Sequence, residues 1–222
     1  MDIKALAQKY EPYIIERRRY FHAHPELSFK EWDTTKALVA EFEKMGMEIQ
    51  TFPDYPGLIA TLDTGKPGRT VMLRADIDAL PVKEGTGLDF ASQNEGVMHA
   101  CGHDNHMAML LGAAHILLEK KDELKGKVKF LLQSGEEMAC GAKYYVDHHI
   151  LDGVDAIFGQ HIWGTLDAPY VCVAAGNRMA SCDNFTIRVK GLQSHGSAPQ
   201  DGHDAIVAAS AIVMALQTYV SR

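Results

Sequence analysis

The order of apolar and polar residues predicts helices and strands that alternate along most of the chain. Apolar positions recur at helical spacing in residues 3–21, 34–45, 103–120 and 141–148. Short apolar, β-rich runs bounded by Gly and Pro fall at residues 47–52, 58–62, 70–75, 128–133 and 156–159. We expect Asp33 to cap the second helix and Gly46 to end it. The alternation favours an α/β fold, with a mostly parallel sheet flanked by helices.

The pattern changes after about residue 176. Residues 184–190 alternate apolar and polar side chains, as in a half-exposed antiparallel strand, and a loop rich in Gly, Ser and Pro leads into a predicted helix over residues 204–219. We therefore expect one domain over residues 1–176 and the start of a smaller α+β domain over residues 177–222. One strand and one helix cannot bury their own apolar faces, so we expect this second domain to be truncated and the sequence to be part of a longer protein.

Composition and charge narrow the possible functions. The hydrophobic content of 46% provides for a substantial core. A net charge of −7 with no basic run argues against nucleic acid as a partner. The N-terminus has no apolar targeting segment, and the most apolar run, residues 205–216, is too short to span a bilayer. Cys101, Cys140, Cys172 and Cys182 show no disulfide framework spacing, so we expect reduced thiols in a cytoplasmic protein without a membrane partner.

Residues 99–106, His-Ala-Cys-Gly-His-Asp-Asn-His, carry the strongest chemical signal. Gly102 lets the backbone turn so that Cys101 and His103 can converge on one point. The start of a helix at this place favours thiolate over thiol. Thiolate and imidazole ligands suit Zn²⁺, Mn²⁺, Co²⁺ or Ni²⁺ rather than Mg²⁺ or Ca²⁺. The alternative interpretation is a buried cysteine beside a capping histidine.

Carboxylates and a histidine follow three of the predicted strands. Glu136 and Glu137 come after the strand at residues 128–133, in a turn between Gly135 and Met138. Successive side chains diverge in extended backbone, so one carboxylate can bind metal while its neighbour faces a metal-bound water and takes its proton. Asp76 and Asp78 end another strand, and one of them could orient a ligand histidine. His161 follows the strand at residues 156–159 and is a candidate for a further coordination position. The alternative for Glu136 and Glu137 is a solvated acidic turn. For the two aspartates it is a role in forming a loop turn, and for His161 it is a structural role.

Four segments together resemble the aminoacylase and carboxypeptidase G family of metallopeptidases. They are residues 19–28, 74–81, 99–104 and 135–137, and the likeness runs over essentially the whole chain in the expected order. Within the family they resemble the amidohydrolase branch of hippurate hydrolases, N-acetyl-diaminopimelate deacetylases and indole-acetyl-amino-acid hydrolases. The resemblance implies a zinc-peptidase-like catalytic domain and a smaller lid domain through which two subunits form a homodimer.

The resemblance also implies a site with two divalent transition-metal ions, Mn, Zn, Co or Ni. Cys101 would bridge the ions, and His103, Glu137 and His161 would each bind one of them. Family members are nearly twice as long as this chain, and a last metal-ligand histidine lies near their C-terminus. Nothing after His203 can supply that histidine here.

Three further roles follow from the same resemblance. Glu136 would be the general base and later the general acid, and Asp78 would orient or tune a ligand near the metals. His195, in the loop at residues 191–199, would stabilise the oxyanion of the tetrahedral intermediate across a dimer interface.

We therefore expect a metal-dependent amidohydrolase that releases an amino acid from an N-acyl amino acid. Two alternatives stay open at this point. One is an amidase in which Cys101 is the nucleophile and His103 or His106 its base. The other is a catalytically silent metal-binding or dimerisation protein, although the spare carboxylate beside a ligand argues against it.

Overall fold

The computed structural model describes residues 2–177, 179, 181 and 183–219, and Cys182 lies outside these residues. The chain divides into two compact units, Met1–Val173 and Ala174–Arg222, which are described separately below. None of the helices in the described part is both long and apolar enough to cross a membrane. The described cysteines Cys101, Cys140 and Cys172 are free thiols.

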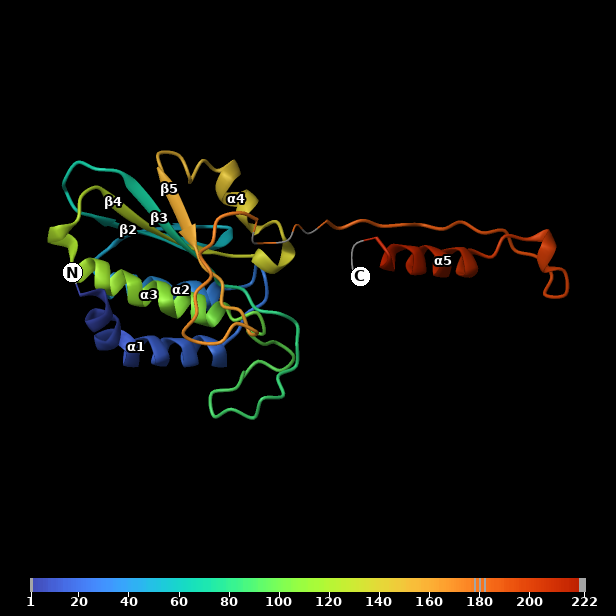
Figure 1. Cartoon of the computed structure of the whole chain (residues 1–222), viewed down its shortest axis with the longest axis horizontal. Coiled ribbons are helices and arrows are strands. Elements are labelled where there is room, and N and C mark those ends of the chain that lie inside the picture. Colours follow the sequence, from blue (N-terminus) through green and yellow to red (C-terminus); the bar gives the residue numbers. More distant parts are fainter. Residues whose placement is uncertain (1, 178, 180, 182, 220–222) are drawn as a thin grey trace. The chain divides into compact units, whose positions relative to one another are not determined.

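The first unit is built on a five-stranded sheet, as far as the described residues show (Figure 1). Its strands lie in the order β1-β2-β4-β3-β5. Their bounds are β1 Glu48–Phe52, β2 Tyr55–Asp63, β3 Thr70–Asp76, β4 Lys127–Gln133 and β5 Ala156–Gly159.

The sheet confirms the predicted α/β fold but is mixed rather than mostly parallel. Strand β3 pairs in parallel with both β4 and β5. Strand β2 pairs antiparallel with β1 and β4. Only Pro53 and Asp54 separate β1 from β2, and so short a connection permits only an antiparallel hairpin.

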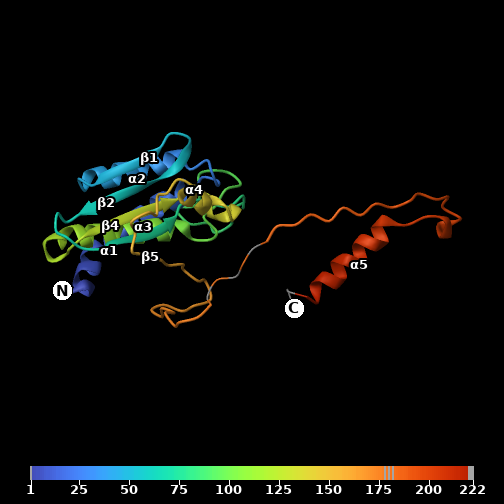
Figure 2. The same cartoon turned by 90° about the horizontal axis from the view of Figure 1, so that it is seen from above.

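Helices cover both faces of this sheet, as Figures 1 and 2 show. Helices α1 (Ile3–Ala23), α2 (Trp32–Lys44) and α3 (His103–Glu119) pack on one face, and α4 (Gly141–Asp147) packs on the other. The larger core lies under the three long helices and includes Phe21, Leu38, Phe42, Met107, Leu111 and Phe130. The smaller core, under α4, includes Phe52, Ile59, Met72, Leu131 and Tyr145.

The start of α2 differs from the prediction. The helix begins at Trp32, with Glu31 rather than Asp33 in the N-cap position. The carboxylate of Glu26 accepts the backbone N–H of Thr34 at 2.7 Å and that of Asp33 at 3.3 Å. A side chain from the preceding connector therefore satisfies the free N–H groups of the first turn, which makes a cap from Asp33 unnecessary.

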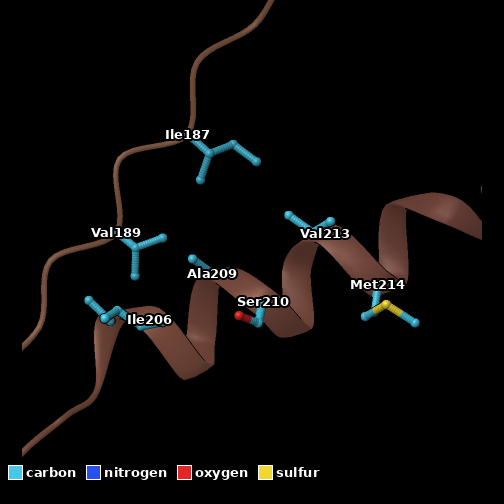
Figure 3. Close-up of a pocket in the computed structure, with 8 residues that line it drawn as sticks. Ile187, Val189, Ile206, Ala209, Ser210, Val213 and Met214 are labelled. Carbon is cyan, nitrogen blue, oxygen red and sulfur yellow. The ribbon is translucent and has the colours of Figure 1, made fainter.

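The second unit contains α5 (Ala205–Gln217), whose first turn is capped by Asp204. The strand predicted over residues 184–190 is wrong, because these residues pair with no other strand in the described part of the chain. A single extended segment has no ladder partner for its backbone groups. Ile187 and Val189 of this segment and apolar residues of α5 line an open apolar groove (Figure 3).

Candidate metal centre

Three parallel strands and one helix bring the candidate residues together. Strands β3, β4 and β5 run in the same direction, so their carboxyl ends lie at one edge of the sheet. Functional sites of open α/β sheets gather at this edge. Helix α3 begins at His103, directly after Gly102, which has the left-handed φ of 85° that glycine adopts without strain.

His103 is the centre of the cluster. Its side chain is fully buried, at 0% exposure. It belongs to three groups whose ligand atoms lie within 4.8 Å of one another, among the described residues. The groups are Cys101-His103-His161, His103-Glu136-Glu137 and Asp76-His103-His106. The structure therefore brings together the four predicted metal ligands and the predicted base Glu136, because they share His103.

The two nitrogens of His103 face different partners. Nδ1 lies 3.3 Å from Oδ1 of Asp78, and Nε2 lies 3.7 Å from Oε1 of Glu137 and 3.8 Å from Oε2 of Glu136. His103 Nε2 and Glu137 Oε1 are both buried, and neither has a hydrogen-bond partner among the described residues. Buried polar atoms without partners are costly, and a cation between these two would satisfy both. The residues present thus fit a metal ion.

Asp78 contacts both His103 and the turn that carries Glu137. Its Oδ2 accepts the hydroxyl of Ser28 at 2.7 Å and the backbone N–H of Glu137 at 2.9 Å. Burial alone would raise the pKa of Asp78, but hydrogen bonds from His103, Ser28 and Glu137 lower it below its ordinary value. An ionised Asp78 therefore connects a histidine at the start of α3 to the turn after β4.

Glu136 and Glu137 lie in a turn, as predicted, but their backbone is not extended there. Both residues lie in a 3₁₀ turn, Glu136–Met138, which follows Gly135 at φ 70°. Successive side chains in a 3₁₀ turn are about 120° apart, so the two carboxylates need not point to opposite sides, and an oxygen of each reaches His103 Nε2. Burial raises the pKa of Glu137, and the carboxylates of Glu136 and Asp78 add to this rise.

Cys101 faces the histidine that follows β5. Its Sγ lies 3.4 Å from Nε2 of His161. Burial and the carboxylates of Glu137 and Glu136 raise the pKa of Cys101 to about 12, so the start of α3 does not by itself give the thiolate that the sequence predicts. A divalent cation among the same carboxylates would supply the missing positive charge, since a coordinating thiol is deprotonated.

His106 and Asp76 form a buried pair beside the cluster, and the sequence analysis did not predict it. His106 Nδ1 lies 2.5 Å from Asp76 Oδ1, and His106 Nε2 accepts the backbone N–H of Ile162 at 3.0 Å. The Arg74 guanidinium lies 2.8 Å from the other oxygen of Asp76. Both nitrogens of His106 are therefore engaged, and the residue holds the segment that carries His161. Its spacing of three residues from His103 places the two on one helix face, which was the available signal.

Two other histidines, His99 and His195, belong to none of the metal-capable groups found among the described residues. His99 is buried, at 4% exposure. Burial lowers its pKa to about 4. His195 lies in the second unit, where Nδ1 is 2.8 Å from the hydroxyl of Ser197 and accepts the Ser197 N–H at 3.2 Å. Its role toward an oxyanion stays a prediction.

Sequence comparison identifies relatives over the whole chain. The profile described as Peptidase family M20/M25/M40 matches residues 72–218. An N-acyl-L-amino acid amidohydrolase of Geobacillus stearothermophilus is 41% identical over 222 residues, which are 100% of this chain and 60% of that protein. An N-acetyl-L-cysteine deacetylase of Bacillus subtilis is 42% identical over 212 residues, covering 96% of this chain and 51% of the deacetylase. The chain thus spans 51% to 60% of the length of these two relatives.

Comparison with solved structures also finds a protein of the M20 family. A crystal structure of a Bacillus subtilis protein, described as a dinuclear metal binding peptidase from the M20 family, superposes with a TM-score of 0.67 and 44% sequence identity. The superposition covers 73% of this chain and 45% of the other.

Proposed function

The chain belongs to the peptidase family M20/M25/M40. We propose that the whole protein is a metal-dependent amidohydrolase that releases the amino acid from an N-acyl amino acid. One observation carries the proposal. His103 Nε2 and Glu137 Oε1 face each other at 3.7 Å, buried and without hydrogen-bond partners among the described residues. A second carboxylate, that of Glu136, lies 3.8 Å from His103 Nε2, close enough to take a proton from water at that place.

Cys101, His103, Glu137 and His161 are the residues that would hold two divalent transition-metal ions. The mixture of thiol, imidazole and carboxylate suits Mn²⁺, Zn²⁺, Co²⁺ or Ni²⁺. The dinuclear description of the Bacillus subtilis relative supports the number of ions. When bound, such ions lower the pKa of water and polarise an amide carbonyl.

The protein's own side chains would then position and move the protons. Glu136 has a side chain that is 39% exposed, and its carboxylate can therefore meet an incoming substrate. We assign it the role of general base toward water and then of general acid toward the leaving amine. Asp78 Oδ1 lies 3.3 Å from Nδ1 of His103, and its negative charge favours a proton on that nitrogen, which would leave the lone pair of Nε2 free for a metal ion. His195 of the second unit is the proposed donor to the oxyanion.

The names of the relatives support the substrate class. One is an amidohydrolase of N-acyl-L-amino acids and another a deacetylase of N-acetyl-L-cysteine. Both names describe hydrolysis of the amide between an acyl group and an amino acid nitrogen. We therefore propose a small N-acyl amino acid as the substrate.

The structure gives no support to Cys101 as a nucleophile. Its raised pKa of about 12 keeps the thiol protonated, and both nitrogens of His106 are already occupied. The silent metal-binding protein is disfavoured by Glu136, since metal binding alone needs no second carboxylate at that place.

Location and assembly complete the proposal. The free thiols of Cys101, Cys140 and Cys172 support a reducing, cytoplasmic environment. The apolar groove between residues 187–189 and α5 supports a homodimer formed through the smaller domain (Figure 3).

The direct test is hydrolysis of a panel of N-acetyl and N-benzoyl amino acids, in which the amount of released amino acid is measured. We expect release that a chelator abolishes and that Mn²⁺, Zn²⁺, Co²⁺ or Ni²⁺ restores. Release that persists after complete removal of metal would overturn the proposal and return attention to Cys101.

A further inference from the structure

The connector between α1 and α2 carries a buried carboxylate that the proposed chemistry does not use. This residue, Glu31, is 0% exposed. Burial raises the pKa of its carboxyl group to about 7, although hydrogen bonds from Ser134 and Gly135 act in the opposite direction. A carboxylate is rarely buried so completely unless specific donors hold it.

The donors to Glu31 come from the turn that carries the catalytic carboxylates. The hydroxyl of Ser134 lies 2.8 Å from Oε1 and 2.7 Å from Oε2 of Glu31. The backbone N–H of Gly135 donates to Oε1 at 3.0 Å. These two residues directly precede Glu136 and Glu137, and they lie more than a hundred residues from Glu31 along the chain.

The same connector contacts this region at two more points. Ser28 donates its hydroxyl to Asp78, which in turn accepts the backbone N–H of Glu137. Phe29 packs against Gly135 so closely that a Cβ on this glycine would lie 2.2 Å from Cε1 of the ring. The connector therefore supports the turn through a hydroxyl, a ring and a carboxylate.

The turn is also confined by the first residue of α4. A Cβ on Gly141, the first residue of α4, would lie 2.0 Å from the carbonyl oxygen of Ser134. The turn between β4 and α4 thus has both Gly141 and the connector close against it. The Ser134 hydroxyl and the Gly135 N–H both donate to the carboxylate of Glu31.

We propose that Glu31 is a positioning residue, whose carboxylate holds Ser134 and Gly135 so that Glu136 and Glu137 face His103. Its effect on turnover rests on the proposed function, whereas its effect on metal binding rests only on the ligand cluster. In Glu31→Ala the Ser134 hydroxyl and the Gly135 N–H lose their buried acceptor, and the turn must move to find water. Glu31→Gln keeps the side-chain volume and one acceptor oxygen, so it retains much of the support.

The test compares these two variants with a matched control at another buried glutamate. Glu41, on α2, is also a buried carboxylate, at 5% exposure. It accepts hydrogen bonds from Tyr13, Arg17 and Lys44, none of which belongs to the metal cluster. Glu41→Ala therefore reports the cost of losing a buried carboxylate without disturbing the turn after β4.

Two readouts are needed, and one of them is independent of activity. Co²⁺ affinity is measured by competition with a chelator, and kcat and KM are measured on the metal-loaded protein. We expect Glu31→Ala to weaken Co²⁺ binding or lower kcat by roughly 10- to 100-fold, the usual loss when an outer-shell partner is removed. KM should change little, Glu31→Gln should lose much less, and Glu41→Ala should lower only the melting temperature.

The outcomes separate this proposal from the proposed function. Wild-type Co²⁺ affinity and kcat in folded Glu31→Ala would overturn the positioning role and leave Glu31 as a stabilising residue only. Equal losses in Glu31→Ala and Glu41→Ala would also overturn it. If the wild-type protein hydrolyses no N-acyl amino acid, the proposed function fails, while a weakened Co²⁺ affinity in Glu31→Ala alone would still support positioning of the ligand turn.

Discussion

Asp78 lies directly behind His103, with its Oδ1 3.3 Å from the imidazole Nδ1. The other oxygen of the same carboxylate accepts the N–H of Glu137 at 2.9 Å. One buried side chain therefore orients a histidine at the start of α3 and a glutamate after β4, two candidate ligands of one metal. This link explains how elements far apart in sequence present their ligand atoms to the same point.

Replacement of Asp78 tests that link. Asp78→Asn removes the charge that favours a proton on Nδ1 of His103, while the side chain keeps its size. We expect metal affinity or kcat to fall by roughly 10- to 100-fold. Isothermal titration with Zn²⁺ and steady-state kinetics measure the two effects. Unchanged values for both would show that Asp78 only stabilises the turn.

Replacement of Glu136 separates proton transfer from metal binding. Glu136→Gln keeps the size of the side chain but cannot accept a proton. Turnover should fall by about 10²- to 10⁴-fold, the usual contribution of a general base. Elemental analysis should find nearly the wild-type metal content in the same sample. A variant that retains most of its activity would show that another group is the base.

Metal affinity should increase with pH. Burial and the neighbouring carboxylates raise the pKa of Cys101 to about 12. Burial alone would lower the pKa of His103, but Asp78, Asp76 and Glu137 raise it overall. Both ligands therefore hold protons more tightly than usual, and a metal ion must displace them. Rising pH weakens this competition, so Co²⁺ titrations between pH 6 and 8 should show tighter binding at the higher pH. An affinity that is flat over this range would contradict the assignment of these ligands.

Replacement of Gly135 tests the close contact between this residue and the ring of Phe29. Gly135→Ala would place a Cβ 2.2 Å from the ring of Phe29, at a residue whose φ is +70°. Gly96→Ala is the matched control, because its φ is +76° and a Cβ there meets nothing within 4 Å. Each variant should lose on the order of 1 kcal/mol of stability from backbone strain. Only Gly135→Ala should also lose most of its metal-dependent activity, which thermal unfolding and kinetic assays would show. Equal activity in the two variants would mean that the turn tolerates displacement.

Regular elements with a strong apolar period could be predicted from sequence. The strand expected at residues 156–159 is β5, Ala156–Gly159, and α3 differs from its prediction by a single residue at its end. Alternation of strands and helices predicts parallel strands, but β1 is antiparallel to β2. The two-residue link through Pro53 and Asp54 is too short for any other pairing. The unpaired segment at residues 184–190 shows that alternation predicts which residues share a face but does not supply a partner strand.

The candidate site was predictable where its residues cluster in sequence or follow parallel strands. Cys101 and His103 share one short motif, and Glu137 and His161 each follow a strand of the same sheet. The environment of these groups was not predictable, because it depends on contacts between distant segments. Glu31 contacts Ser134, which is 103 residues away in sequence. Burial and nearby carboxylates raise the pKa of Cys101 although it lies beside a helix start.

Anomalous X-ray diffraction from metal-loaded crystals of the protein would show directly whether two ions bind at His103. Data collected on either side of the absorption edge of the added Mn²⁺, Co²⁺ or Zn²⁺ locate the ions. We predict two peaks, within bonding distance of His103 Nε2, a Glu137 carboxylate oxygen, Cys101 Sγ and His161. Crystals that bind the ion elsewhere, or that show no peak beside His103 at saturating metal, would contradict a dinuclear site at these residues.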